Sequence, residues 1–159
     1  MEYQLDVPLG RRWFEARFSP SGPEEVVALI RDITERKTAE EAISASEQRF
    51  RGLFAQSMDA IYVVDYDGSN IRANPAWLRL LGYSAEELPQ HNIIELYANP
   101  GDRQRLLDAI GRTGLYEDEL RARKKDGTEF DCARTVTALR NEEGSVVGFQ
   151  GIMRDITDR

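Results

Sequence analysis

Hydrophobic and polar residues alternate with a period of two in several short stretches of this chain, a pattern that predicts β-strands. In the first part of the chain the predicted strands cover residues 2–9, 12–19 and 26–31. In the second part they cover residues 59–65, 70–73, 115–124, 128–139 and 146–155. Turn residues such as Gly10, Gly68 and Gly127 separate neighbouring strands, which favours antiparallel hairpins.

Between Thr34 and Gln56 the apolar positions recur at three- and four-residue steps instead, which predicts one long helix. The apolar stripe of this helix includes the bulky residues Ile43, Phe50 and Leu53. Two interpretations stay open. The helix packs on its own domain, or it forms a short parallel coiled coil with another subunit.

Shorter helices are predicted between the strands of the second part. Asn74 and Pro75 are residue types typical of a helix cap and of the first helical position, and residues 102–113 carry another apolar stripe. Two strands, a helical region and three further strands together predict an α+β domain with one five-stranded antiparallel sheet.

Four residues at the end of the third predicted strand recur at the end of the last strand. Arg31-Asp32-Ile33-Thr34 reappears as Arg154-Asp155-Ile156-Thr157, and residues 10–17 match residues 127–134 with Arg17 at the position of Arg134. An internal repeat of this kind indicates two copies of one domain type. We therefore expect residues 1–33 to be the C-terminal three-strand segment of an upstream domain, residues 34–56 a linker helix, and residues 57–157 a complete domain.

The composition narrows the range of functions. The chain has 159 residues, of which 41% are hydrophobic and 31% charged, with a net charge of −7 that disfavours nucleic acid and anionic membranes as partners. No apolar run reaches the length of a membrane-spanning helix. The single cysteine, Cys132, excludes an internal disulfide and a cysteine-based zinc site, and fits a cytoplasmic location.

The order of these elements resembles the PAS sensor domain of bacterial and archaeal signalling proteins, over about residues 45–157. The matching residues are turn and helix-start positions in a fixed order: Asp67-Gly68, Asn74-Pro75-Ala76, Gly82-Tyr83-Ser84, Glu86-Glu87-Leu88, Lys125-Asp126-Gly127-Thr128, Gly144 and Asp155-Ile156-Thr157. The resemblance implies a sheet of strand order 2-1-5-4-3 with short helices on one face that enclose a pocket. It also implies a second, upstream PAS domain that contributed residues 1–33.

The resemblance makes some cofactors more plausible than others. Photoactive flavin relatives carry a cysteine where this chain has Ile93, which argues against a cysteinyl-flavin adduct. Haem-binding relatives use a histidine on the long helix, and residues 102–113 contain none; His91 precedes that helix and is expected to be a surface or local hydrogen-bonding residue. We therefore predict neither haem nor a metal site, while a non-covalently bound flavin or small organic ligand stays open.

Eight residues are candidates for the lining of the pocket: Ile61, Val63, Trp77, Leu106, Ile110, Cys132, Arg134 and Gly151. Cys132 is expected to be a buried structural thiol. Arg134 has two interpretations. It points outward and pairs with a carboxylate such as Glu119, or it lies in the pocket and holds an anionic ligand.

The resemblance implies a sensory domain of a multidomain signalling protein, with a histidine kinase of a two-component system or a diguanylate cyclase as its output domain. Signals would pass through two strand-to-helix junctions, at Asp32 and Thr34 and at Asp155 and Thr157. One hypothesis is that the domain senses a small ligand; the alternative is a ligand-free dimerisation and relay module. We expect no enzymatic activity, because no nucleophile stands with a base, and we expect a homodimer through residues 34–54 and the outer face of the sheet.

Overall fold

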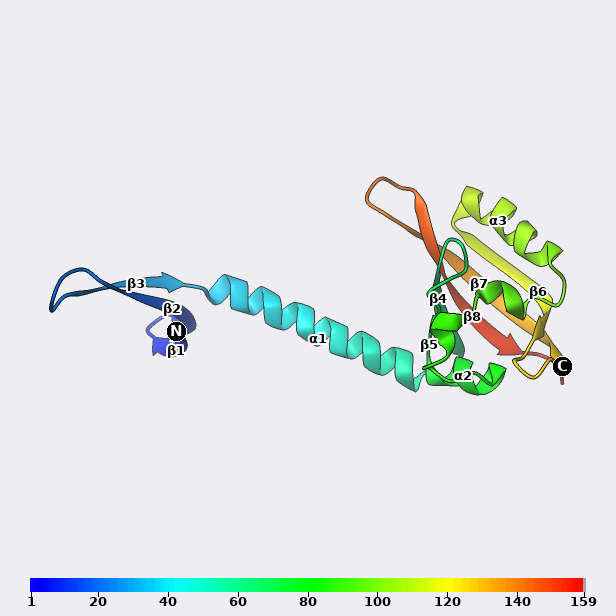
Figure 1. Cartoon of the computed structure of the whole chain (residues 1–159), viewed down its shortest axis with the longest axis horizontal. Coiled ribbons are helices and arrows are strands. Elements are labelled where there is room, and N and C mark those ends of the chain that lie inside the picture. The colour runs from blue at the N-terminus through cyan, green and yellow to red at the C-terminus, as the bar shows by residue number, and fades with distance from the viewer. Residues whose placement is uncertain (159) are drawn as a thin grey trace. The chain divides into compact units, whose positions relative to one another are not determined.

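The computed structural model describes residues 1–158 and divides into two compact units, the second of which begins at Gly52. In the first unit, strands β1 (Glu2–Val7), β2 (Gly10–Pro20) and β3 (Val26–Asp32) form an antiparallel sheet of order β1-β2-β3. Helix α1 (Thr34–Gln56) follows β3 in the chain (Figure 1).

Charged contacts join β1 of the first unit to the beginning of α1. The Glu2 carboxylate lies 2.6 Å from the Arg36 guanidinium and 2.5 Å from the Lys37 ammonium. The same Lys37 ammonium lies over the Trp13 ring, 5.1 Å from its centroid. Hydrogen bonding from Lys37 lowers the pKa of Glu2. These contacts supplement a small apolar core formed by Ala16 and Ile33.

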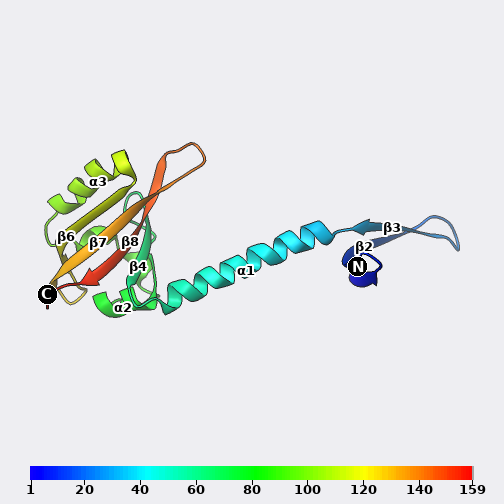
Figure 2. The same cartoon turned by 180° about the vertical axis from the view of Figure 1, so that it is seen from behind.

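The second unit contains the predicted five-stranded antiparallel sheet, which confirms the α+β class. Its strands are β4 (Ala60–Asp65), β5 (Arg72–Ala73), β6 (Leu115–Arg123), β7 (Glu129–Arg140) and β8 (Val146–Asp155). They pair in the order β5-β4-β8-β7-β6, which reads 2-1-5-4-3 when the strands of this sheet are numbered along the chain. Figure 2 shows β4, β8, β7 and β6 of this sheet.

Four helical segments lie between β5 and β6. They are α2 (Pro75–Leu81), the 3-10 helices η1 (Leu88–Gln90) and η2 (Ile93–Leu96), and α3 (Gly101–Thr113). Asn74 caps α2, since its side-chain oxygen accepts a hydrogen bond from the Trp77 amide at 3.0 Å. No helix among residues 1–158 is long and apolar enough to cross a bilayer.

One face of the second sheet forms the hydrophobic core with these helices. On β4 the residues Ala60, Tyr62 and Val64 are buried, whereas Ile61 and Val63 alternate with them and are only half-buried. The prediction that Ile61 and Val63 line the interior is therefore wrong. The run from Ala60 to Val64 is apolar throughout, so its sequence does not reveal which alternate residues face inward, and a shift of one residue exchanges the two faces.

Candidate functional site

The interior of the second unit contains a small cavity between the sheet and η2. Its volume is about 10 Å³, roughly the space of a single water molecule. Its lining residues come from four strands and from the segment around η2: Tyr62, Ile93, Leu96, Tyr97, Leu120, Ala122, Arg134 and Met153. Of the eight predicted lining residues, only Arg134 lies in this wall.

Tyr62 lines this cavity, and its ring packs directly on Gly151. Tyr62 on β4 pairs directly with Gly151 on β8, and a β-carbon at position 151 would overlap the Tyr62 ring. The ring therefore lies across the glycine, where no other residue would leave space for it. The ring is also packed near Trp77, with centroids 6.3 Å apart, and burial raises the pKa of Tyr62. Gly151 is thus buried in the interior, where it accommodates a side chain of the protein and is not part of the cavity wall.

Among the described residues that line this cavity, Arg134 is the one with a cationic group. Its side chain is 3% exposed, and its Nε and Nη2 atoms donate to the two carboxylate oxygens of Asp118 at 3.0 and 2.8 Å. Its Nη1 atom donates to the Tyr97 hydroxyl at 2.6 Å. Burial is the largest single influence and opposes the positive charge, but the hydrogen bonds to Asp118, together with the electrostatic effects of Tyr62, Tyr97 and Asp118, outweigh it, so the pKa of Arg134 is raised. The expected outward pairing with Glu119 is wrong, because Arg134 points inward and its partner is Asp118.

The proposed equivalence of Arg17 and Arg134 is also wrong, by one residue. Ala16 pairs with Ile30 in the first sheet, and Arg134 pairs with Met153 in the second. Ile30 and Met153 each lie two residues before the repeated Asp, so their partners Ala16 and Arg134 occupy equivalent positions. Arg17 instead has an exposed side chain that contacts the Glu15 carboxylate. The sequence match missed this shift because the hairpin loops that precede the two strands differ in length.

The remaining predicted pocket residues belong to the packed core. Trp77, Leu106, Ile110 and Cys132 are each at most 2% exposed. Burial raises the pKa of the Cys132 thiol to about 12, which makes it a poor nucleophile, as expected for a structural cysteine. The Trp77 indole N–H has no hydrogen-bond acceptor among the described residues.

His91 follows η1 in the chain and contacts two nearby side chains. Its Nδ1 atom lies 2.8 Å from a carboxylate oxygen of Glu95, and its ring packs edge-on against Tyr83 at 4.9 Å between centroids. This confirms the prediction of a local hydrogen-bonding residue. Within residues 1–158, no group of three or more His, Cys, Asp and Glu side chains is arranged to hold a metal ion.

The first strand-to-helix junction is a compact hydrogen-bonded turn. An Asp32 carboxylate oxygen accepts from the Thr34 amide at 2.9 Å and from the Thr34 hydroxyl at 2.6 Å. The hydroxyl oxygen in turn accepts from the Trp13 amide at 3.0 Å, and the Ile33 amide donates to the Trp13 carbonyl at 2.9 Å. The hydrogen bonds from Thr34 lower the pKa of Asp32 to about 2.

The second junction reproduces every one of these contacts. Asp155 accepts from the Thr157 amide at 3.0 Å and from its hydroxyl at 2.6 Å. The Thr157 hydroxyl oxygen accepts from the Asp131 amide at 3.3 Å, and the Ile156 amide donates to the Asp131 carbonyl at 2.9 Å. Hydrogen bonding from Thr157 also lowers the pKa of Asp155. The repeated sequence is thus a repeated structure that ties the last strand to its neighbour.

The sheet order, the helices on one face, the small interior cavity and the structured turn after the last strand define an α+β domain of one recognisable class. Residues 58–158 match the PAS domain family, and the chain belongs to that family. The predicted family is therefore confirmed.

Known relatives include signalling kinases. Sporulation kinase E of Bacillus subtilis (strain 168) is 29% identical over 142 residues, which cover 87% of this chain and 18% of the kinase. The methanogenesis regulatory histidine kinase FilI of Methanothrix harundinacea (strain 6Ac) is 28% identical over 149 residues, which cover 90% of this chain and 17% of that kinase. The chain thus spans less than a fifth of the length of these relatives.

A solved structure supports the same assignment. The PAS domain of a protein from Colwellia psychrerythraea is 31% identical, with a TM-score of 0.65, and the match covers 72% of this chain and 99% of that domain. Together, the family and its kinase relatives identify a domain with a sensory role in signal transduction.

Proposed function

We propose that this chain relays a signal within a multidomain sensor, from α1 through the PAS domain to an output domain beyond Thr157. The observation that carries the proposal is the duplicated junction, in which the same six backbone and side-chain groups form the same hydrogen bonds after β3 and after β8. In the first copy this turn leads directly into α1. A turn that fixes how a helix leaves a sheet transmits changes in the sheet to that helix.

The junction can be tested in a chimera in which this chain replaces the matching segment of sporulation kinase E. We expect Asp155→Asn and Thr157→Val each to change autophosphorylation at least about fivefold, because an allosteric coupling free energy of roughly 1 kcal/mol corresponds to that factor. Arg123→Gln, which removes an exposed ion pair with Glu129, is the matched control. Unchanged output in both junction variants, with an active chimera, would contradict the relay.

The pH dependence of the junction provides a second arm of the same test. The pKa of Asp32 is depressed from its ordinary 3.8 to about 2 in the folded chain. The carboxylate contact therefore contributes in full above pH 3.8 and is lost as the pH falls through about 2. NMR of the Asp32 carboxyl group should show a titration midpoint near pH 2, and the chemical shift of the Thr34 amide should change over the same pH range. Thr34→Val should raise the pKa of Asp32, because it removes the hydroxyl hydrogen bond.

The proposed output domain is a histidine kinase, the class to which the relative FilI belongs, and the alternative is a cyclic-dinucleotide enzyme. On the same proposal, β1 to β3 are the last strands of a preceding PAS domain, because they end in the same junction as the second unit. The chain itself then contributes sensing and relay, while catalysis belongs to the output domain.

Ligand sensing is a second candidate, favoured by the buried Arg134 in the wall of the interior cavity. Tyr97 and Arg134 offer polar contacts there, and the other walls are mainly apolar. A cavity of about 10 Å³ admits a flavin or another organic ligand only if Tyr62 moves off Gly151. The candidate is therefore a small organic ligand whose binding is coupled to the position of the Tyr62 ring.

A homodimer through α1 and the outer face of the sheet is part of the relay proposal. Ile43, Phe50 and Leu53 are 60–67% exposed on α1. Light scattering should give the mass of a dimer for the wild-type chain and of a monomer for Ile43→Glu combined with Phe50→Glu, since charges at a buried helix interface are costly. Glu41→Lys on the same helix is the control, and a wild-type chain that stays monomeric at high concentration would contradict the dimer.

A further inference from the structure

Residues 57–59 form a short connector between α1 and β4, and one buried side chain, Asn74, bonds to the end of α1, to the connector and to β4. Asn74 has no exposed surface, and its Nδ2 atom donates to the Phe54 carbonyl at 3.0 Å and to the Asp59 carbonyl at 2.9 Å. Its Oδ1 atom accepts from the Ile61 amide at 2.9 Å and from the Trp77 amide at 3.0 Å. All four hydrogen-bonding positions of this amide are used, so the last turn of α1 and the start of β4 are fixed to one point.

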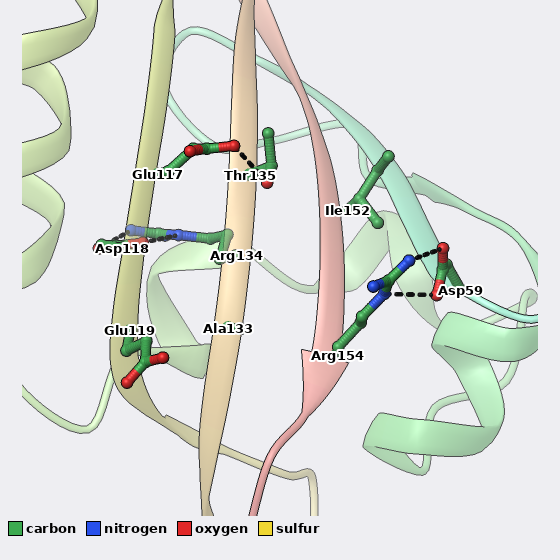
Figure 3. Close-up of a pocket in the computed structure, with 9 residues that line it drawn as sticks. All are labelled: Asp59, Glu117, Asp118, Glu119, Ala133, Arg134, Thr135, Ile152 and Arg154. Atoms are coloured by element: carbon green, nitrogen blue, oxygen red, sulfur yellow. Dashed lines mark hydrogen bonds and ion pairs between the residues drawn. The ribbon is translucent and has the colours of Figure 1, made fainter.

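Asp59, the last residue of this connector, also contacts the end of β8. The Arg154 Nε and Nη2 atoms donate to the two Asp59 carboxylate oxygens, each at 2.8 Å (Figure 3). The adjacent residues, Ala60 and Met153, form the last pair of the β4–β8 ladder. Arg154 directly precedes Asp155, whose carboxylate holds Thr157 in the exit junction.

These contacts form a short path between the residues by which the chain enters and leaves the domain. It runs from the last turn of α1 through the connector to Arg154 and then to Asp155. None of the connector residues and neither Arg154 nor Asp155 lines the interior cavity. A bidentate guanidinium–carboxylate pair fixes both distance and orientation, which a single hydrogen bond does not.

We propose that the Asp59–Arg154 pair is a clasp that couples the entry helix to the exit junction without involving the interior. This inference rests on the proposed relay and specifies its positioning residues. The clasp is exposed, with side chains 67% and 35% accessible for Arg154 and Asp59, so it contributes little to stability. Its role is to make local opening of the two ends cooperative.

Amide hydrogen exchange on this chain tests the clasp. A substitution in the connector is followed through the amides of the exit junction, and a substitution at the end of β8 is followed through an amide at the end of α1. Asp59→Asn should speed exchange of the Ile156 and Thr157 amides by about two- to fivefold, the range set by an exposed ion pair. Arg154→Gln should speed exchange of the Ser57 amide, which donates to the Leu53 carbonyl in the last turn of α1, by a similar factor. Coupling between two sites is reciprocal, so both effects are required.

Two further variants separate coupling from local damage. The double variant Asp59→Arg with Arg154→Asp exchanges the two charges, and it should return the exchange rates of the Ser57, Ile156 and Thr157 amides toward their wild-type values. The control Arg123→Gln, which breaks the exposed pair with Glu129, should change none of these rates. Unchanged exchange at the distant ends, or failure of the charge exchange to restore it, would overturn the clasp. The kinase chimera with Asp155→Asn and Thr157→Val tests the relay separately, so a failed clasp with responsive junction variants leaves the relay intact.

Discussion

Replacing Asp118 by alanine should lower the free energy of unfolding by about 3–5 kcal/mol, one of the two largest effects we expect in this chain. Arg134 is almost fully buried, and Asp118 supplies both oxygens that face its Nε and Nη2 atoms. Without them a guanidinium would stay in the core with only the Tyr97 hydroxyl as a partner. Urea denaturation of the second unit, followed by circular dichroism, measures the loss.

Two variants show whether the loss comes from the uncompensated charge. Glu117→Ala removes an exposed carboxylate of the same strand and should change stability by no more than about 0.5 kcal/mol. Combining Asp118→Ala with Arg134→Met removes both charges and should restore most of the lost stability, since buried ion pairs can often be replaced by apolar residues. If Asp118→Ala alone costs less than about 1 kcal/mol, Arg134 is not confined to the core as described.

Replacing Tyr62 by alanine should cost a similar amount, about 3–5 kcal/mol, because it empties the space above Gly151. The space that it leaves joins the small cavity whose wall includes Tyr62 and Arg134. We expect p-cresol, which has the shape of the deleted side chain, to bind there and to recover about 1.4 kcal/mol at ten times its Kd. Denaturation curves with increasing p-cresol measure both effects.

Tyr62→Phe is the matched control, because it keeps the ring and removes only the hydroxyl. It should leave most of the stability in place and should not respond to p-cresol. If Tyr62→Ala gains no stability from p-cresol or from similar small phenols, the core closes around the deleted ring. In that case the proposed coupling between Tyr62 and an interior ligand has no physical basis.

Much of this fold could be predicted from local sequence signals, because those signals act within a few residues. The Asn74-Pro75 pair placed the start of α2, and the repeated Asp-Ile-Thr sequence marked two turns with the same hydrogen bonds. The helix from Thr34 to Gln56 was predicted with its observed limits. Each of these features depends on a cap, a turn or a helical period that the residues themselves encode.

The interior could be predicted only in part, because its arrangement depends on strand register. The phase of β4 decides whether Tyr62 or its neighbours Ile61 and Val63 face the core, and a uniformly apolar strand does not reveal that phase. Alternation on β7 placed Arg134 with Cys132 and Val136, but its partner on β6 became clear only from the pairing of Asp118 with Arg134. A glycine opposite an aromatic residue, as at Gly151 and Tyr62, was the one signal that could have indicated the filled interior.

The two junctions also bear on how proteins of this kind gain and lose domains. In each copy the side-chain hydrogen bonds of the turn are formed with the sheet that precedes it, through Trp13 in the first and Asp131 in the second. The hydrogen bonds of the turn therefore place no sequence requirement on the residues after the Thr. After Thr34, the contacts of Arg36 and Lys37 with Glu2 and Trp13 add to the turn. A gene fusion or duplication that cuts just after the turn would leave its hydrogen bonds complete on the upstream piece, so different downstream segments can be joined there without redesigning the turn.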